Sequence, residues 1–502
     1  MIKSVGIDLS NLGRHQVRVL DEEARVCDSF TFQTTLEGLE AFEQHVFVDG
    51  ANPTIVFEPT GLAWLPLASY LRARHPESRL VRAKLQKVAA LRRYLRGTAK
   101  SDRVDALTLA KMAFIDSEHL DEVYLPPAQM HALQRLTRQR DRLMESVATR
   151  KKRIGSIIDG HLPGLRDAFP DEWSPGARAF YRHKLNPFKT AREDAKAIHR
   201  FLLEADPRDK TLDQQSREAL AKCRELVVIY ERTLPVGTMN ESFFDDLQEE
   251  IGCELRLLET EEAEARKLSV RISELYLQLD PEDHLGTIPG VGERTAPVFL
   301  GTVGEPKRFR GQSAFGNWTG VVPSAKQSSD TEGKGLRMTK AGPKVMKRSL
   351  YQAADIARRG DPQLAAVYYR QMVVHGKSHR KALGAVMSHL AARVFVVIKE
   401  GRPYELRDPD GKPISKEDAL ALIRSKYTVS EEVRRQRRRR NPQKKAPSGK
   451  RRERSGPSRT IEAAEAPQPE SPNLPHSPVY VAEEHPSKLS ADLTDAQGKP
   501  AG

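Results

Sequence analysis

Four carboxylates in the N-terminal part of the chain have residue types and spacing that suit a divalent metal site. Asp8 lies in the apolar stretch VGIDLS, Glu58 ends the apolar stretch TIVFE, and Asp102 and Asp105 lie in KSDRVDALTLA. The last two are three residues apart, which places them on one face of a helix. Carboxylate oxygens bind Mg²⁺ and Mn²⁺, and paired ions of this kind serve in phosphoryl transfer.

Each carboxylate also has a simpler explanation. Asp8 suits a half-exposed strand, and Glu58 suits the point where a strand leaves the core. Asp102 suits a helix N-cap, and Asp105 would then face the helix dipole in the first turn. The order of the surrounding elements decides between these explanations and a shared site, because it determines which carboxylates meet.

Residues 1–125 are predicted to form an α/β domain of the order βββαβαβα. Expected strands cover 4–10, 15–22, 26–34, 52–61 and 78–84, and expected helices cover 35–47, with Thr35 as N-cap, 62–75, and a segment through Asp105. This is the order of an RNase H/RuvC-like domain. A doubly wound sheet is the alternative, although that fold rarely opens with three consecutive strands.

The predicted strand order brings the four carboxylates together. The first and fourth strands are neighbours in such a sheet, and the last helix crosses their end. Carboxylates that converge there repel each other by several kcal/mol at about 4 Å, and bound cations remove that repulsion. A basic cluster just before Asp102 is expected to receive phosphates; it consists of Arg92, Arg93, Arg96 and Lys100.

Residues 126–282 are predicted to be helical, with an insertion at about 163–240. Apolar seams along 128–161 and 243–279 favour a helical hairpin or a coiled coil, and an ordinary helical bundle is the alternative. Arg140 and Arg150 interrupt the first seam, and Glu254 and Glu261 interrupt the second. These opposite charges favour the two helices as partners.

Residues 283–405 are predicted to form a mostly helical C-terminal domain. IPGVGERTA has the turn of a helix-hairpin-helix, in which Gly290 and Gly292 would let backbone N–H groups approach a phosphate; a tight interhelical turn is the alternative. Ser328 and Ser329 suit a polar loop by their chemistry alone. A basic run follows them, and its expected nucleic-acid-binding members are Lys340, Lys344, Lys347 and Arg348.

Residues 406–502 are predicted to be a mostly disordered tail with a short helix through SKEDALALIRSKY (415–427) and a basic block at 434–454. The chain has a net charge of +14, much of it from this block, and the excess favours nucleic acid over anionic membrane as a partner. No apolar run approaches the length of a membrane span. Three scattered cysteines fit a reducing compartment, so we expect a cytoplasmic, nucleoid-associated protein.

Taken together, these motifs resemble the DEDD-type insertion-sequence transposases of the IS110 family, also described as bridge-RNA-guided recombinases. GIDLS and FEPTG resemble the family's first-strand Asp and its Glu, and KSDRVDALTLA resembles its Lys-x-Asp-x-x-Asp-Ala helix. IPGVGERTA, FRGQSAFGNWTGVVP and the segment from QSS to MTKAGPKVMKRSL resemble its C-terminal transposase domain. The resemblance covers about 1–160 and 245–400, and the ordered set of motifs is specific although no single motif is.

The resemblance implies a recombinase that excises and inserts DNA. The four carboxylates would bind Mg²⁺ or Mn²⁺ in a RuvC-like site, and Ser328 would attack a DNA phosphate as the nucleophile. The family has Gly after this serine where the present chain has Ser329, so Ser329 stays an alternative nucleophile.

The implied partners are DNA, a non-coding bridge RNA whose base pairing supplies sequence specificity, and further copies of the chain. The copies would form a dimer or a tetramer through the coiled coil, with composite sites built from two subunits. A metal-dependent nuclease resembling Holliday-junction resolvases is the first alternative, and a non-catalytic nucleic-acid-binding protein is the second.

Overall fold

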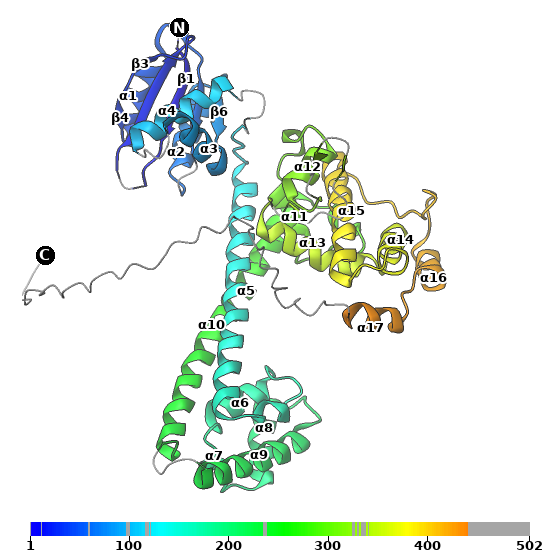
Figure 1. Cartoon of the computed structure of the whole chain (residues 1–502). Helices are drawn as coiled ribbons and strands as arrows, with labels where there is room; N and C mark the ends of the chain where they lie inside the picture. Colours follow the sequence, from blue (N-terminus) through cyan, green and yellow to red (C-terminus); the bar gives the residue numbers. More distant parts are fainter. Residues whose placement is uncertain are drawn as a thin grey trace, which may run out of the picture. The chain divides into compact units, whose positions relative to one another are not determined.

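The structure is a computed structural model, shown in Figure 1. It describes residues 2–11, 13–58, 61–96, 101–115, 120, 122–233, 238–323, 327–328, 331–332, 338–339 and 341–439.

The N-terminal domain is built on one mixed sheet of order β3-β2-β1-β5-β6. Its strands are β1 (Ile2–Asp8), β2 (His15–Asp21), β3 (Val26–Asp28), β4 (Thr31–Phe32), β5 (Thr54–Phe57) and β6 (Arg79–Arg82). β2 is antiparallel to β1, whereas β1, β5 and β6 are parallel to one another. The predicted neighbourhood of the first strand and the apolar strand before Glu58 is therefore confirmed.

The expected third strand is divided in two. β3 and β4 both pair with β2, but they are separated by Ser29 and Phe30. The Asp28 side chain accepts a hydrogen bond from the Ser29 N–H, which turns the chain between the two short strands.

Helices cover both faces of the sheet (Figure 1). They are α1 (Leu36–Val46), α2 (Trp64–Arg74), α3 (Leu85–Arg96) and α4 (Asp102–Ile115). Thr35 is the N-cap of α1, as expected, and its hydroxyl accepts from the Gly38 N–H at 3.2 Å. The prediction missed α3, because its sequence is basic and its apolar face is narrow. On that face, Val88 is buried in the small core under α4, and Leu91 packs against that core.

The middle of the chain contains two long helices, α5 (Ala128–His161) and α10 (Glu241–Leu279), which pack side by side (Figure 1). Their buried positions include Val147, Ile154 and Ile251 from the expected seams. Arg150 projects from α5 to both interrupting glutamates of α10, at 2.6 Å from Glu254 and 2.9 Å from Glu261.

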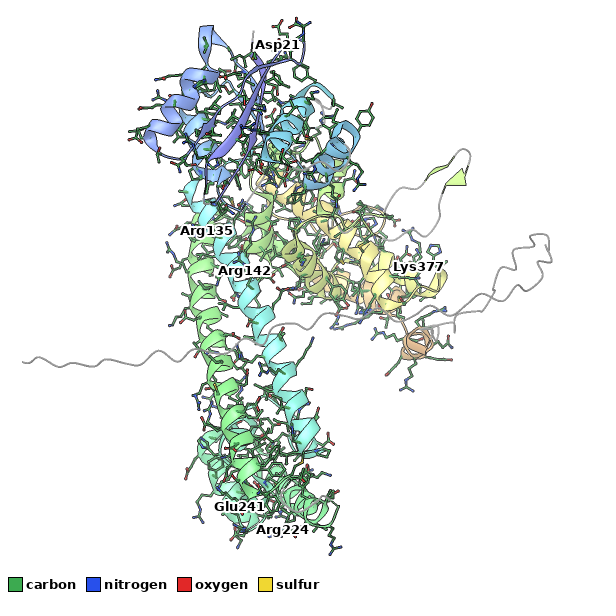
Figure 2. All side chains as sticks on the ribbon, turned by 60° about the vertical axis from the view of Figure 1, so that its left-hand side comes forward. Asp21, Arg135, Arg142, Arg224, Glu241 and Lys377 are labelled. Carbon is green, nitrogen blue, oxygen red and sulfur yellow. The ribbon has the colours of Figure 1, made fainter. Side chains whose placement is uncertain are left out.

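The chain between these helices forms a helical unit that docks on the hairpin. It contains α6 (Pro175–His183), α7 (Pro187–Thr190), α8 (Ala195–Ala205) and α9 (Leu212–Thr233). Its core residues, such as Phe180 and Leu202, form one apolar cluster with residues of both long helices. Figure 2 labels Arg224 and Glu241 in this part of the chain.

The C-terminal domain is helical apart from one small hairpin. It contains α11 (Ala296–Val303), α12 (Gln312–Thr319), β7 (Gln327–Ser328), β8 (Thr331–Glu332), α13 (Lys344–Ala357), α14 (Pro362–Tyr369), the π-helical segment η6 (Arg370–Val374) and α15 (His379–Glu400). Among the described residues, α15 alone is long and apolar enough to span a bilayer, and 56% of that window is buried inside the domain. The run VFVVI thus understates the apolar length of this helix, which forms the centre of the domain core.

The short helix expected at residues 415–427 is present, and ordered structure also continues into the basic block, which was expected to be disordered. The short helix is α16 (Lys416–Lys426), with Ser415 as its N-cap, and α17 (Glu431–Arg439) covers the first residues of the basic block. Val429 between them is buried in the domain core, which explains why this segment is ordered despite its charge. The rest of the block, 440–454, lies outside the described residues.

The mixed sheet and the many helices confirm the α/β plus α layout and fit an RNase H/RuvC-like domain.

Candidate active site

A glycine brings α4 into unusually close contact with β1. A Cβ on Gly6 would lie 2.1 Å from the carbonyl oxygen of Ala106 and 2.3 Å from the amide nitrogen of Ala110, so only glycine fits. Two residues earlier on β1, the Ser4 hydroxyl donates to the Ala110 carbonyl at 2.8 Å. The two elements therefore run in opposite directions, with the start of α4 at the carboxyl end of β1.

This packing brings Asp8, at the carboxyl end of β1, beside the first turn of α4, which contains Asp102. Side chains alternate along a strand, so Asp8 projects from the same face of the sheet as Ser4 and Gly6. Two strand residues advance about 6.6 Å and four helix residues about 6 Å. Continuing the pairing of Gly6 with Ala106 by one step brings Asp8 to the first turn of α4, where Asp102 shares a helix face with Ala106.

Glu58 reaches the same place from the neighbouring strand. Ile7 of β1 pairs with Phe57 of β5, so the next residues, Asp8 and Glu58, end the two parallel strands together. Val56 belongs to the apolar cluster under α4, and alternation directs Glu58 to that same face.

Asp105 is held by an arginine of α3. Its side chain is 10% exposed and lies 2.7 Å from the guanidinium of Arg92. The N-cap role considered for Asp102 falls to Ser101 instead, whose hydroxyl accepts from the Val104 N–H at 3.3 Å. Asp102 is exposed in the first turn, so its carboxylate is accessible to a ligand.

The donor set suits a hard divalent cation, because it consists of carboxylate oxygens at the ends of three elements. Among the described residues, no three His, Cys, Asp or Glu side chains are close enough to hold a metal ion as they stand. Strand register and helix packing bring the backbones of the four residues to one edge, whereas the Asp105 carboxylate is turned to Arg92. Binding an ion through all four would require this ion pair to open.

The cations around this edge differ from the predicted set. Arg92 contacts a carboxylate, Arg93 is exposed on α3, and the side chain of Arg96 and all of Lys100 lie outside the described residues. Sequence reasoning missed Tyr94, which follows Arg93 and is 85% exposed.

It also missed Arg18 of β2, which pairs with Gly6 in the sheet and so lies on the face that α4 covers. One terminal nitrogen of Arg18, Nη1, is buried without a hydrogen-bond partner in the described part of the chain. Burial, and then the nearby charge of Arg103, lower the pKa of Arg18. The sequence contained a signal for this position: side chains alternate along β2, and Val17 and Val19 belong to the core on the other face, so Arg18 between them must lie on the α4 face.

Ser328 lies in the C-terminal domain, at the end of β7, where its backbone pairs with Thr331 of β8. Pro323 and Met338, on either side of this hairpin, form an isolated antiparallel β-bridge. The Ser328 side chain and all of Ser329 lie outside the described residues, as does Lys340.

The other predicted nucleic-acid contacts of this domain have partners inside the protein. A Cβ on Gly290, which has φ +84°, would lie 2.5 Å from the Ala353 carbonyl oxygen, so close packing against α13 accounts for this glycine. The Gly292 N–H donates to the Thr295 hydroxyl at 3.1 Å.

The basic residues at the start of α13 are partly engaged as well. Arg348 forms ion pairs with Asp141 and Glu145 of α5, and Lys347 is half-buried with a partner of its own. Lys344 is exposed at the first position of the helix.

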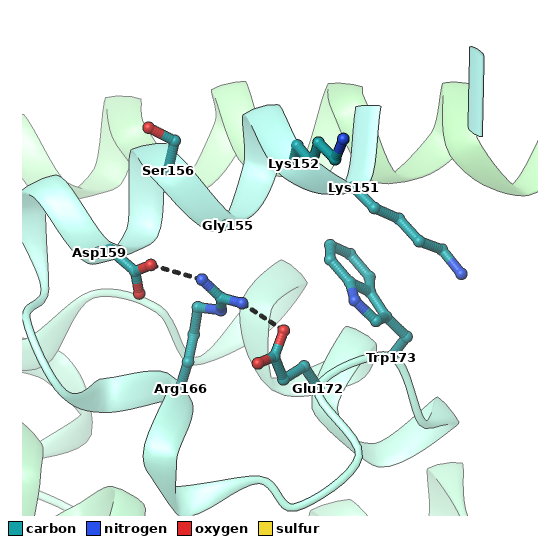
Figure 3. A pocket seen from close by; sticks show the side chains of 8 residues that line it. All are labelled: Lys151, Lys152, Gly155, Ser156, Asp159, Arg166, Glu172 and Trp173. Atoms are coloured by element: carbon teal, nitrogen blue, oxygen red, sulfur yellow. Dashed lines mark hydrogen bonds and ion pairs between the residues drawn. The ribbon is translucent and has the colours of Figure 1, made fainter. Parts of the chain in front are cut away.

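Two hollows lie beside the docked helical unit. One of about 400 Å³ lies between α5 and the docked helical unit and is shown in Figure 3. Arg166 in its wall is paired with Asp159 and Glu172, and Lys151 lies over the Trp173 ring while pairing with Glu262. These side chains hold the unit to the hairpin and supply no reactive group.

Comparison with known proteins finds two segments of the chain that match family models. A family model described as "Transposase", for the DEDD transposases of IS110, matches residues 5–163. A second, described as "Transposase IS116/IS110/IS902 family", matches residues 282–369.

Individual relatives agree with these matches. The Insertion element IS110 uncharacterized 43.6 kDa protein of Streptomyces coelicolor is 31% identical over 29% of this chain and 36% of its own length. The Pilin gene-inverting proteins of Moraxella lacunata and Moraxella bovis are each 27% identical over 24% of this chain and 38% of theirs. The alignments thus span less than two fifths of each relative. The two family matches, in this order, make the chain similar to transposases of the IS110 family over residues 5–163 and 282–369.

Proposed function

We propose that the chain is a DNA recombinase that breaks and rejoins strands by metal-assisted phosphoryl transfer. The observation that supports this most is the packing of β1, β5 and α4, from which we infer that Asp8, Glu58 and Asp102 lie at one edge of the sheet with Asp105 one helical turn further on.

These four carboxylates would hold Mg²⁺ or Mn²⁺. A bound divalent cation would neutralise charge that develops on the phosphate and would lower the pKa of an attacking hydroxyl. Arg92 would exchange its partner Asp105 for a phosphate oxygen when the carboxylate turns to the cation. Arg93 would add a second contact to the DNA backbone, and the exposed ring of Tyr94 would stack on an unpaired base.

Ser328 would be the nucleophile. Its hydroxyl loses a proton, the serine oxygen forms a bond to phosphorus, and the phosphate ester bond to the leaving deoxyribose breaks as that oxygen gains a proton. A hydroxyl of another DNA strand then attacks the phosphoserine, which restores the serine and needs no external energy source. Excision, insertion and inversion are all outcomes of this exchange, and inversion is the activity in the printed name of the Moraxella relatives.

We further propose that a bridge RNA supplies sequence specificity and that two or more copies of the chain assemble the complete site in the cytoplasm. The support for both is the similarity to this transposase family alone. In such an assembly Ser328 of one copy would act at the carboxylates of another.

The test is to trap the covalent intermediate. The full chain is incubated with DNA, its RNA and Mg²⁺, and protein-linked DNA is separated under denaturing conditions. The proposal predicts a link that Ser328→Ala abolishes and Ser329→Ala retains. If DNA is cut equally well in both variants and no link forms, the enzyme is a metal-dependent nuclease of the resolvase type, and the serine mechanism is wrong.

A further inference from the structure

Residues 370–439 lie beyond both family matches, and they contain an ordered basic helix with no assigned role. This helix, α17, packs on α15 and on the π-helical segment η6. Its anchor is apolar: Val429 is 4% exposed, and Val433 packs against the same core. The anchor holds a strongly basic segment in a fixed place on the domain.

A glycine lets one arginine of α17 lie flat on the neighbouring turn. Gly376 has φ +60°, and a Cβ there would lie 3.2–3.3 Å from the guanidinium atoms of Arg437. The Nε of Arg437 and the Oε1 of Gln371 in η6 are buried without a hydrogen-bond partner within the described ranges. The guanidinium is therefore positioned by packing and not by an acidic partner.

Further cations surround this contact. Lys377, Arg380 and Lys381 are exposed on the turn and the first turn of α15, and Arg434 is exposed on α17. Burial raises the pKa of the Tyr368 phenol, and Arg434 lies close enough for its charge to oppose that rise. The Tyr368 hydroxyl forms a hydrogen bond with His379 at the start of α15. We call this set the C-terminal basic surface; it consists of Lys377, Arg380, Lys381, Arg434 and Arg437.

Three exposed cations of the helical hairpin and its docked unit differ, because each has an acidic partner. Arg217 lies 2.7 Å from Asp213, Lys267 lies 2.7 Å from Glu264, and Arg271 lies 2.8 Å from Glu274. The structure describes no ion pair for any member of the C-terminal basic surface, although it describes all five side chains. Uncompensated like charges on a docked helix repel one another, and a polyanion relieves that repulsion.

We propose that the C-terminal basic surface binds the phosphate backbone of double-stranded DNA without reading its sequence. The choice of DNA as the polyanion rests on the proposed function, since this domain also carries Ser328. Binding itself needs neither the carboxylates nor a cation. Each phosphate contact releases counterions, so the surface contributes to the salt dependence of binding.

The experiment compares two variants of the full chain that lose the same charge. Lys377→Gln, Arg380→Gln and Arg434→Gln together remove three members of the surface. Arg217→Gln, Lys267→Gln and Arg271→Gln together remove three exposed cations that already have acidic partners. Affinity for a random-sequence DNA duplex is measured between 50 and 200 mM salt, and circular dichroism checks that both variants are folded.

The surface variant is expected to lower the slope of log affinity against log salt by about 2 to 3, at about 0.9 per lost contact. The control variant should keep the slope of the unaltered chain. Equal slopes in both variants would overturn the proposal, and so would a loss confined to duplex RNA in a parallel titration. Asp102→Asn serves as the reference: if it stops strand cleavage while the surface variant still cuts at saturating DNA, the surface and the active site are separate.

Discussion

Carboxylates are arranged in two different ways in two regions of this molecule. In the helical hairpin, Glu254 and Glu261 lie midway along α10 and share one arginine, Arg150, from the facing helix. In the N-terminal domain, Asp8, Glu58 and Asp102 lie at the ends of three elements that meet at one edge, and Arg92 contacts Asp105 there. The carboxylates in the middle of the packed helices stabilise the fold through ion pairs, whereas we propose that those at the element ends bind a divalent cation.

The largest expected effect is on chemistry at the N-terminal edge. Asp102→Asn should lower the rate of strand cleavage by about a thousandfold, because metal ligands contribute several kcal/mol of transition-state stabilisation. Its melting temperature should change little, since Asp102 is exposed. Glu37→Gln, at the exposed first turn of α1, is the matched control and should leave the cleavage rate unaltered. A variant that loses stability and keeps its cleavage rate would remove the distinction between the two regions.

The hairpin should respond in the opposite way. Arg150→Ala leaves two mostly buried glutamates without their shared partner and should lower the free energy of unfolding by about 3 kcal/mol. Chemical denaturation of the full chain measures this loss. Arg271→Ala, whose exposed ion pair lies within one helix, should cost less than about 0.5 kcal/mol. If the two variants were equally stable, the hairpin ion pairs would not be structural.

Gly6→Ala should affect both stability and activity, because it alters the packing of α4 and displaces the candidate site. The added methyl group meets the backbone of α4 and should lower the free energy of unfolding by about 2 kcal/mol while displacing Asp102 from Asp8. Denaturation and cleavage assays on one preparation measure both effects. In Gly160→Ala on α5 the methyl group meets nothing within 4 Å, so this variant should be slightly stabilised. Full activity in Gly6→Ala would argue against the close approach of α4 as the source of the site.

The smallest effect concerns pH at the junction of α10 and the C-terminal domain. His284 bonds to Asp280 at 2.5 Å, and this hydrogen bond raises the pKa of the imidazole. A raised folded-state pKa stabilises the protein fully below the unfolded value of about 6.5, and the contribution disappears as pH rises through the folded value. His284→Gln should therefore lose about 1 kcal/mol at pH 6 and nothing at high pH in denaturant titrations. A loss that is independent of pH would assign His284 a packing role only.

Much of the α/β domain could be predicted because its signals are local. Alternating apolar residues define β1 and β2, a continuous apolar run defines β5, and Thr35 marks the start of α1. The strand order then implied that Asp8 and Glu58 end neighbouring strands. The close contact of α4 with Gly6 was not predictable, because it depends on which backbone lies opposite the glycine.

Other elements were missed for similar reasons. α3 and α17 are ordered by a few apolar side chains, such as Val88 and Val433, within sequences that otherwise indicate loops or disorder. Gly290 matched a phosphate-binding turn in sequence, but helix packing explains it equally well once α13 is placed beside it. Tertiary contacts, which a single sequence does not reveal, decided each of these cases.

The central claim is that four carboxylates from three elements form one metal site, and Mn²⁺ binding tests it most directly. The full chain is titrated with Mn²⁺ alone, and free ion is counted by electron paramagnetic resonance, so no DNA or activity is involved. We predict saturable binding of one or two ions that Asp8→Asn and Asp102→Asn each weaken by at least about tenfold, with no change in Glu37→Gln. Equal affinity in all four proteins, or no saturable binding in the unaltered chain, would contradict the account.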